Sequence, residues 1–169
     1  VKRALFKSDI VIVSIFVNPT QFNDQNDLNA YPRTLEKDLD HLSEVSSALI
    51  VFHPDTNELY GDQLKAKSFD FKQLDSVMEG AHRPGHFDGV ATVVELLFKS
   101  TRPTIAFFGE KDYQQTLIVK QLVKQKRLGI LIEVCPTIRE SNGLARSSRN
   151  ERLSAQGRLR AAFIYEQLM

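Results

Sequence analysis

The sequence predicts an α/β domain built on a mostly parallel sheet with helices on both faces. Short apolar runs rich in β-branched residues recur along the chain, and segments long enough for a crossover helix separate them. Parallel neighbouring strands need such long connections, and the right-handed crossover supplies them. Sheets of this kind bind ligands beyond the carboxyl ends of their strands. Function is therefore expected in the loops at those ends.

The first part of the chain predicts two strands with a helix between them. The run 10–17 is almost continuously apolar, as expected of a strand covered on both faces, and it stops at an Asn-Pro pair. Apolar residues recur at helical spacing over 35–45, behind Thr34 as a candidate N-cap. The run 48–52 predicts the second strand, which a following proline ends.

The second part of the chain repeats this alternation after a less regular region. Residues 64–80 hold one candidate short strand, around 69–71. Beyond them, the pattern predicts a helix over 90–98, a strand over 105–108, a helix around 117–123, a strand over 130–134 and a last helix that begins near Ser154.

Composition excludes several classes of protein. The 169 residues include 22 Lys and Arg against 21 Asp and Glu, so the net charge of +1 offers no extended surface for a nucleic acid. A single cysteine, Cys135, rules out an internal disulfide, and no apolar run approaches the roughly 20 residues that span a bilayer. We expect a cytoplasmic protein without nucleic-acid or membrane partners. Because the chain starts without Met and enters folded-looking sequence at once, we expect it to be part of a longer one.

The loop after the third predicted strand has the features of an anion site. Gly109 lets a ligand approach the backbone closely, and Lys111 places a cation at the start of a helix. Asp112 has two open interpretations, as a helix cap or as an acceptor for ribose hydroxyls. Gln114 and Gln115 carry amides suited to the hydroxyl or carbonyl groups of a small polar ligand.

The loop after the fourth predicted strand is rich in phosphate-binding residue types. Three arginines and three serines lie within 139–150. Arginine makes forked contacts to phosphate and serine adds donors, so a triphosphate or pyrophosphate fits this loop; a basic surface loop is the alternative. Neither a P-loop nor a Gly-x-Gly-x-x-Gly motif is present, which disfavours a P-loop kinase and a dinucleotide dehydrogenase.

Two further features have simpler interpretations. The segment 81–89 carries two histidines that are not spaced as zinc ligands, and it is interpreted as an ordered flap or a dimer-contact loop. Cys135 ends a strand with no base near it in the sequence, so it is expected to be buried and without a catalytic role.

Five motifs, in order and over nearly the whole chain, resemble the pantothenate synthetase family. They are Phe16-Val17-Asn18-Pro19-Thr20-Gln21-Phe22, Tyr31-Pro32-Arg33, Arg83-Pro84-Gly85-His86-Phe87-Asp88-Gly89-Val90, Phe108-Gly109-Glu110-Lys111-Asp112-Tyr113-Gln114-Gln115 and Ser147-Ser148-Arg149-Asn150. Each motif alone is weak evidence for the family, but five motifs in the same order with the expected spacing are specific evidence for it.

The resemblance implies a fold, a reaction and partners. The fold would be the Rossmann-like parallel sheet of the nucleotidylyltransferase superfamily, related to class I aminoacyl-tRNA synthetases, with 1–136 as the nucleotide- and pantoate-binding domain and 137–169 as the phosphate-binding loop and the start of a C-terminal lid domain. The reaction would be the ATP-dependent condensation of pantoate with β-alanine through a pantoyl adenylate, releasing AMP and pyrophosphate on the way to coenzyme A. Mg²⁺ would assist, and the enzyme would be a cytoplasmic homodimer.

The resemblance also implies roles for individual residues. Gln21 and Gln115 would hold pantoate, with Gln21 near β-alanine and Asn18 shaping the pocket. Asp38 would contribute through a metal, and Arg83 would be a secondary contributor. Lys111, Ser147 and Arg149 would be catalytic. The ATP site would comprise Gly109, Glu110, Lys111, Asp112, Ile138, Arg146, Ser147, Ser148 and Arg149.

Departures from the family leave two other functions open. Arg146 stands where the family more often has an apolar residue. The first strand, with a His-x-Gly-His motif that supplies the catalytic acid, would precede Val1, and the lid domain would continue past Met169. The alternatives are a nucleotidyltransferase of the same superfamily, against which the two glutamines argue, and a nucleotide-binding fragment without catalytic activity.

Overall fold

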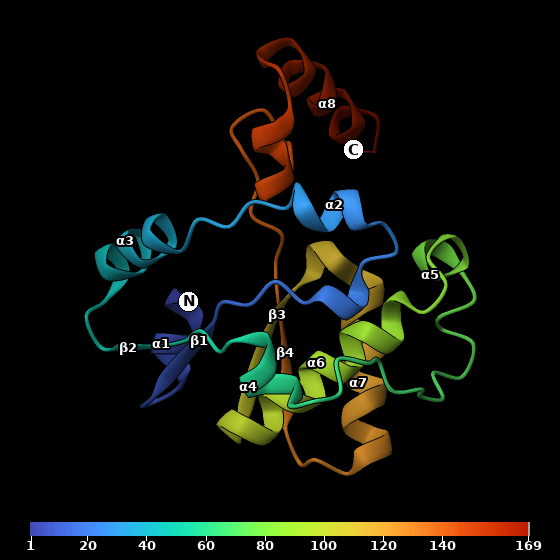
Figure 1. Ribbon diagram of the computed structural model, residues 1–169. Coiled ribbons are helices and arrows are strands. Elements are labelled where there is room, and N and C mark those ends of the chain that lie inside the picture. The colour runs from blue at the N-terminus through green and yellow to red at the C-terminus, as the bar shows by residue number, and fades with distance from the viewer. Residues whose placement is uncertain (169) are drawn as a thin grey trace.

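The computed structural model describes residues 1–168 and has the predicted α/β fold with parallel strand pairs (Figure 1). Strand β1 (Val11–Ser14) pairs with β2 (Leu49–Phe52), and β3 (Ile105–Gly109) pairs with β4 (Leu131–Cys135). Within the described chain the four strands form two separate two-stranded sheets rather than one continuous sheet. The order of the strands along the chain is as predicted.

The first predicted strand is shorter than its apolar run. After Ser14, one further backbone bond, from Ile15 N to Phe52 O, continues the pairing, and the chain then turns into the 3-10 helix η1 (Pro19–Gln21). Phe16 packs against the core although it lies beyond the strand. The expectation of a strand covered on both faces is wrong, because Val11 is buried whereas Ile12 is 39% exposed and Ile10 is 70% exposed.

The candidate strand at 69–71 is wrong, because these residues form no ladder. Phe71 is buried in the core, and Phe69 packs against that core and stacks on Phe71 with ring centroids 5.8 Å apart. The backbone N–H of Phe69 donates to the carboxylate of Asp88 on a neighbouring helix instead of to a strand. Alternating aromatic residues here serve as anchors for an irregular segment.

All four predicted helices are present, with adjusted bounds. They are α3 (Leu35–Val45), α6 (His86–Thr101), α7 (Tyr113–Lys126) and α8 (Ala155–Leu168). Thr34 stands at the N-cap of α3, although its side chain makes no capping bond. α6 begins a turn before its apolar pattern because Gly85, at φ +77°, allows the chain to enter the helix from a left-handed conformation.

The short elements were not predicted. They are α1 (Lys2–Lys7), α2 (Gln25–Asn29), α4 (Thr56–Tyr60), α5 (Met78–His82) and the 3-10 helices η1, η2 (Glu110–Asp112) and η3 (Ser148–Arg152). The sequence did contain a helix-start pattern for α4, because Asp55 and Glu58 form a capping box. The other short helices lack the repeated apolar spacing that identifies longer ones.

The core lies mainly between α6, α7 and the strand pair β3–β4. Phe87, Val90, Ile118 and Leu122 are among its fully enclosed side chains, and partly buried residues of β3 and β4 pack against them. α6 is buried on nearly all sides, as expected of a central helix. It is the element against which the loop after β1 rests, with η1 among its most extensive contacts.

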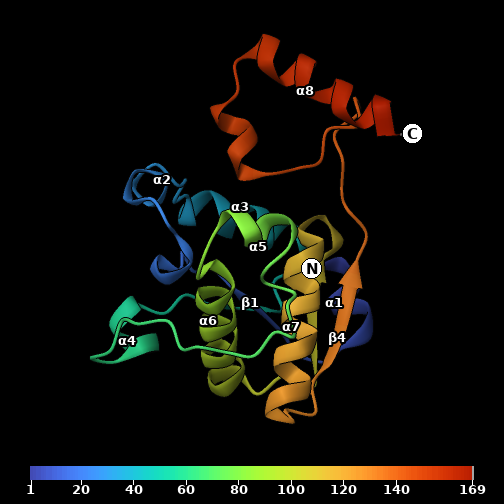
Figure 2. The ribbon, with the colours of Figure 1, turned by 90° about the vertical axis from the view of Figure 1, so that its right-hand side faces the viewer.

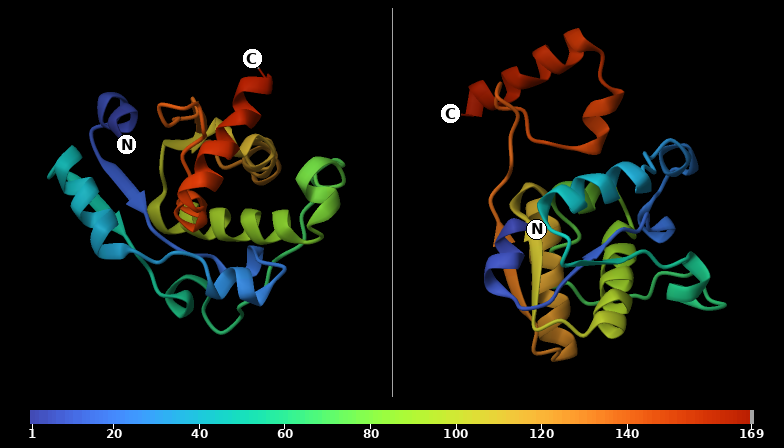
Figure 3. Two further views of the ribbon diagram at one scale, coloured as in Figure 1. Left: turned by 90° about the horizontal axis from the view of Figure 1, so that it is seen from above. Right: turned by 90° about the vertical axis from the view of Figure 1, so that its left-hand side faces the viewer.

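η3 and α8 lie apart from this core, above α2 and α3, and an extended segment after β4 leads to them (Figures 2 and 3). The predicted domain boundary at 136 falls in this segment and stays a prediction; the last residue of the predicted second domain, Met169, lies outside the described residues. Of the helices described over residues 1–168, none has the length and apolar character needed to span a membrane.

Candidate active site

The loop after β1 is fixed to the first turn of α6. Asn18 is 3% exposed, and its Nδ2 donates to the carbonyl of Gly89 at 3.1 Å and to Oε1 of Gln21 at 3.2 Å. A Cβ atom at Gly89 would collide with the carbonyl of Thr20, so only glycine permits this close approach. The predicted pantoate residues Asn18 and Gln21 are thus held together by a helix that is about 70 residues away in the sequence.

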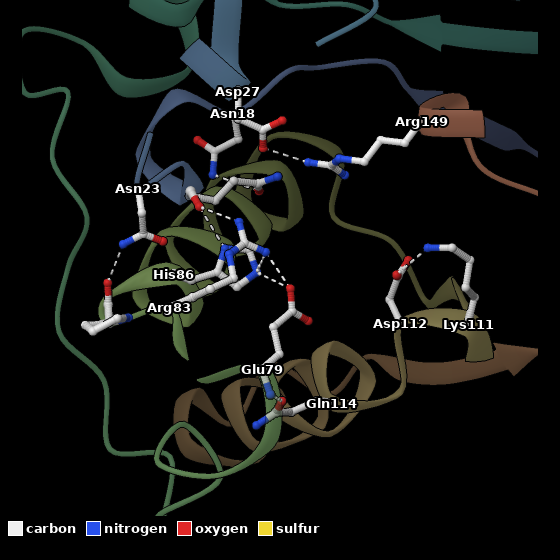
Figure 4. Close-up of polar contacts among 12 residues, drawn as sticks. Asn18, Asn23, Asp27, Glu79, Arg83, His86, Lys111, Asp112, Gln114 and Arg149 are labelled. Carbon is white, nitrogen blue, oxygen red and sulfur yellow. Dashed lines mark hydrogen bonds and ion pairs between the residues drawn. The ribbon is translucent and has the colours of Figure 1, made fainter. Parts of the chain in front are cut away.

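The backbone of Gln21 is held from the same side. Its carbonyl oxygen accepts from Nδ1 of His86 at 2.8 Å and from Nη2 of Arg83 at 3.3 Å. Nη1 of Arg83 donates in turn to Oε1 of Glu79 at 2.5 Å, as Figure 4 shows. The segment 81–89, interpreted from the sequence as a flap or dimer-contact loop, therefore contacts the loop after β1 directly.

His86 has a defined protonation state in this network. Burial lowers the pKa of the ring below its ordinary value, and the guanidinium groups of Arg83 and Arg149 lower it further, against raising contributions from the Gln21 carbonyl and Glu79. A neutral ring with its proton on Nδ1 satisfies both neighbours, because Nε2 then accepts from Arg83 Nη1 at 3.2 Å. His86 acts here as an uncharged bridge.

The two adjacent glutamines at the start of α7 have different surroundings. Gln114 is 4% exposed; its amide donates to the carbonyls of Leu74 and Val77 and accepts from the backbone of Glu79. It therefore fixes the segment leading into α5. Gln115 is half-buried, and within residues 1–168 its side chain makes no hydrogen bond. Of the two, Gln115 is the one available to a ligand.

The loop after β3 presents exposed charges beside open space. Lys111 donates to Oδ1 of Asp112 at 2.7 Å, and both side chains are exposed. Asp112 stands at the N-cap position of α7, but its side chain makes no capping bond. A Cβ atom at Gly109 would meet nothing within 4 Å. A ligand can approach this backbone, as the sequence predicts.

The loop after β4 uses some of its polar residues for its own structure. Arg139 donates to the carbonyl of Gly143 and lies 4.2 Å from the ring centroid of Tyr165, while Ser147 caps η3 by accepting from the backbone of Arg149. Arg146 and Ile138 are exposed. An open hollow of about 770 Å³ is lined by Glu140, Ser141, Arg146, Ser147, Ser148, Glu151 and Arg158.

Arg149 connects this loop to α2. Its Nη2 donates to Oδ2 of Asp27 at 3.0 Å, and its guanidinium lies 5.1 Å from the ring centroid of Tyr31. Arg152 donates to the other carboxylate oxygen of Asp27 at 3.2 Å. The hydrogen bond from Arg149 is the main cause that holds the pKa of Asp27 below its ordinary value. We call these three residues, Asp27, Arg149 and Arg152, the Asp27 bridge.

The structure brings only some of the predicted site residues together. Gln21, Asn18 and Arg83 form one network, and Arg149 lies near enough to His86 to affect its pKa. Within residues 1–168, no hydrogen bond or ion pair joins Lys111 to the loop 146–149 (Figure 4). The phosphate-binding residue types therefore approach the site from two separate loops.

Asp38 lies in the first turn of α3 and is half-buried. Over residues 1–168, no group of three or more His, Cys, Asp or Glu side chains is close enough to hold a metal ion. Mg²⁺ is commonly bound by one or two carboxylates together with phosphate oxygens and water, so a single carboxylate suits the ion only alongside a phosphorylated ligand. The assignment of Asp38 stays a prediction.

Sequence reasoning missed three residues that shape the site. Tyr60 donates to Oδ1 of Asn18 at 2.5 Å, Glu79 accepts from Arg83, and Asp27 accepts from Arg149. Tyr60 and Asp27 bind partners that are distant in the sequence, whereas Glu79 binds the nearby Arg83. None of these three residues lies in a loop at the end of a strand. Asp27 and Glu79 each belong to a helix of only five residues, for which no apolar periodicity exists. Cys135, expected to be buried, is half-buried at the end of β4.

Comparisons with known proteins agree with the motifs. A family model described as Pantoate-beta-alanine ligase matches residues 1–169. Pantothenate synthetases from Christiangramia forsetii and Flavobacterium psychrophilum are 56% and 49% identical to this chain, each over 99% of it and 59% of their own length. The chain thus spans about three fifths of the length of these curated relatives.

Solved structures give the same result. The pantothenate synthetase of Thermus thermophilus superposes with a TM-score of 0.93 at 42% identity, covering 99% of this chain and 60% of that one. A pantoate-β-alanine ligase from Francisella tularensis, complexed with β-γ ATP and β-alanine, superposes with a TM-score of 0.92 at 42% identity over 99% and 64% of the two chains. Fold, motifs and matched length agree, and the chain belongs to the pantoate-β-alanine ligase family.

Proposed function

We propose that this chain carries the ATP- and pantoate-binding part of a ligase that joins pantoate to β-alanine through a pantoyl adenylate. The observation that carries the proposal is the network around Gln21. Asn18 holds its side-chain amide, His86 binds its backbone carbonyl, and Arg149 lies near enough to His86 to lower the pKa of that ring. A neutral amide suits a hydroxy acid, and a nearby guanidinium suits the phosphates of a nucleotide. The Francisella tularensis relative was solved with β-γ ATP and β-alanine, which supports these substrates.

Each predicted site residue has a role in this proposal. Gln21 and Gln115 bind pantoate, and Asn18 holds Gln21 in place. Lys111 and Arg149 neutralise phosphate oxygens, Asp112 accepts hydrogen bonds from the ribose hydroxyls, and Asp38 would hold Mg²⁺. The remaining nucleotide contacts come from Gly109, Glu110, Ile138, Arg146, Ser147 and Ser148.

The chemistry needs these groups in two steps. Pantoate carboxylate attacks the α-phosphorus, the bond to pyrophosphate breaks, and negative charge increases on the phosphate oxygens, where cations stabilise the transition state. The amine of β-alanine then attacks the acyl carbon, a C–N bond forms, and AMP leaves as the amine loses its proton. Mg²⁺, when bound, neutralises phosphate charge. We propose the cytoplasm as location and a homodimer as assembly.

The test replaces the matching segment of the Christiangramia forsetii relative with residues 1–168 of this chain, since the two align over 168 residues at 56% identity. The chimaera should catalyse pantoate-dependent exchange of labelled pyrophosphate into ATP, which requires a reversible adenylation of pantoate. A folded chimaera without exchange, beside an active parent, would overturn the proposal. Exchange that does not depend on pantoate would instead indicate a nucleotidyltransferase.

A variant then tests the role of Lys111 in the same chimaera. Lys111→Ala should slow single-turnover adenylation by on the order of 10²–10³-fold, because an oriented charge beside the reacting phosphate contributes several kcal/mol to the transition state. Lys120→Ala, at an exposed position on α7 away from the loop, is the matched control and should be unaffected. Unchanged adenylation by Lys111→Ala would remove this residue from the mechanism.

A further inference from the structure

A chain of hydrogen bonds begins at Tyr60 and ends at the amide of Gln21. The hydroxyl of Tyr60 donates to Oδ1 of Asn18 at 2.5 Å, and the hydroxyl of Thr20 donates to the same oxygen at 3.1 Å. Nδ2 of Asn18 donates to Oε1 of Gln21 at 3.2 Å and to the carbonyl of Gly89 at 3.1 Å. Every polar atom of the Asn18 amide is therefore used.

These hydrogen bonds fix the orientation of the side-chain amides of Asn18 and Gln21, because they determine where the oxygen and the nitrogen of each amide lie. The carbonyl of Gly89 can only accept, so it requires the nitrogen of Asn18 on its side, and the hydroxyls of Tyr60 and Thr20 then donate to the oxygen at the other end. The nitrogen of Asn18 in turn requires the oxygen of Gln21. Within the described residues, Nε2 of Gln21 makes no hydrogen bond, and it is the end of the amide that remains for a ligand.

Tyr60 is well suited to set this direction. It lies at the end of α4, and its ring stacks on Phe16 with centroids 6.5 Å apart. Burial is the main cause that raises the pKa of the phenol above its ordinary value of 10.0, so the hydroxyl keeps its proton near neutral pH. A ring fixed by packing and a permanently protonated hydroxyl make a rigid donor.

We propose that Tyr60 is a positioning residue for the hydroxy-acid substrate: by holding Asn18 in this orientation, it keeps the amide of Gln21 turned so that Nε2–H donates to a substrate oxygen. The inference rests on the proposed function for the identity of that substrate. Pantoate offers carboxylate and hydroxyl oxygens, all of which accept hydrogen bonds. An amide turned the other way would present a carbonyl oxygen to the carboxylate, which repels it.

The main test is Tyr60→Phe in the 169-residue chain, with Tyr165→Phe as control. Both changes remove one hydroxyl and keep the ring; Tyr165 lies against Arg139 and outside the hydrogen-bond chain. We expect Tyr60→Phe to weaken pantoate binding about tenfold, as loss of one well-placed hydrogen bond does, and to leave ATP binding unchanged. Calorimetry gives both dissociation constants.

A second readout does not depend on the substrate. Side-chain amide signals of Asn18 and Gln21 in ¹H–¹⁵N spectra report their hydrogen bonds in the protein without ligand. Tyr60→Phe should shift both signals and speed exchange of the Asn18 amide protons, whereas Tyr165→Phe should leave them in place. Unchanged amide signals would overturn the proposal, and so would unchanged pantoate affinity beside a wild type that binds pantoate.

Gln21→Glu provides a test if Tyr60→Phe fails to fold. A glutamate keeps the oxygen that accepts from Asn18 but has no Nε2–H, so pantoate affinity should fall at least about tenfold. Gln63→Glu, in the exposed loop after α4, is the control for added charge. Undiminished pantoate binding by Gln21→Glu would overturn the inferred direction of the amide.

The two readouts separate failure of this inference from failure of the proposed function. Should the wild-type chain bind no pantoate, the proposed function loses its support, while the amide signals still decide whether Tyr60 orients Asn18 and Gln21. Should the wild type bind pantoate and Tyr60→Phe bind it equally well, the role of Tyr60 is refuted and the function stands.

Discussion

At the scale of the residue, the site depends on side chains held in one protonation state and one orientation. His86 is 6% exposed and bridges the Gln21 carbonyl and Arg83 as a neutral ring. A protonated ring would place a third positive charge near Arg83 and Arg149, with Glu79 as the one facing carboxylate among the described residues. Since the pKa of His86 is lowered, mainly by burial, folding disfavours the protonated form.

This predicts a pH dependence of stability. The ordinary pKa of 6.5 applies to the unfolded chain, so as pH falls through 6.5 the unfolded state binds a proton that the folded state rejects. Free energy of unfolding is therefore lost as pH falls from above 6.5 toward the lowered pKa. His86→Asn, whose Nδ2 can still donate to Gln21, should lose less stability than wild type between about pH 7.5 and 5.5 in urea titrations. Equal losses of unfolding free energy in the two proteins would refute the inference that folding lowers the pKa of His86.

At the scale of the element, the first turn of α6 supports the loop after β1, where we propose that pantoate binds. Gly89 brings the helix backbone against the carbonyl of Thr20, and its own carbonyl accepts from Asn18. His86, one turn earlier, binds the backbone of Gln21. Positions three residues apart lie on one face of a helix, so both contacts meet the same 3-10 helix, η1.

Two glycine substitutions separate this support from the ligand site. Gly89→Ala should lower the free energy of unfolding by about 1–3 kcal/mol, because the added methyl group collides with fixed backbone. Gly109→Ala adds the same methyl group where no atom lies within 4 Å, so it should leave stability almost unchanged but weaken ATP binding. Urea denaturation and calorimetry measure the two effects; a stable Gly89→Ala protein would contradict the packing argument.

At the scale of the whole molecule, ion pairs join segments that are far apart in the sequence. The Asp27 bridge connects α2 to η3, and Lys37 of α3 donates to Glu151 of η3 at 3.1 Å. Figure 2 shows η3 and α8 above these helices, beyond the extended segment that follows β4. Arg149, which we propose to bind phosphate, is thus engaged by a carboxylate in the protein without ligand.

Competition between Asp27 and phosphate for Arg149 is therefore expected. Asp27→Asn should raise ATP affinity by up to about fivefold, since an exposed ion pair contributes roughly 0–1 kcal/mol. Asp70→Asn removes the same charge from an exposed ion pair with Lys72, outside the predicted nucleotide site, and should not change ATP affinity. Calorimetric titration with ATP compares the variants, and an equal or lower affinity of Asp27→Asn would contradict competition.

Much of the architecture could be predicted because it depends on local pattern. The strands at 49–52, 105–109 and 131–135 follow from short apolar runs, and the helices α3, α6, α7 and α8 follow from apolar residues that recur at a period of about 3.6. The segment 69–71 shows the limit of this reasoning. Its alternating aromatic residues are buried without a partner strand, and burial was the only property that the pattern measured.

The candidate site could be predicted by residue type but not by geometry. Gln114 and Gln115 are identical in the sequence, yet the turn of about 100° between successive helical residues sends one into the core and leaves the other available. Likewise, the motif containing His86 was visible, but its contact with Gln21 crosses 65 residues. No local pattern encodes such a pairing.

The sequence by itself determined the order of the four strands and of the longer helices, the family, and the loops in which we propose that function lies, because burial pattern and motif chemistry are properties of neighbouring residues. Only the tertiary structure decided that Tyr60, Asn18 and Gln21 form one hydrogen-bond chain and that Asp27 occupies Arg149. These contacts depend on how α4, η1 and η3 lie in space. Packing of the whole chain sets that arrangement, and a buried amide then takes the one orientation that satisfies all of its neighbours.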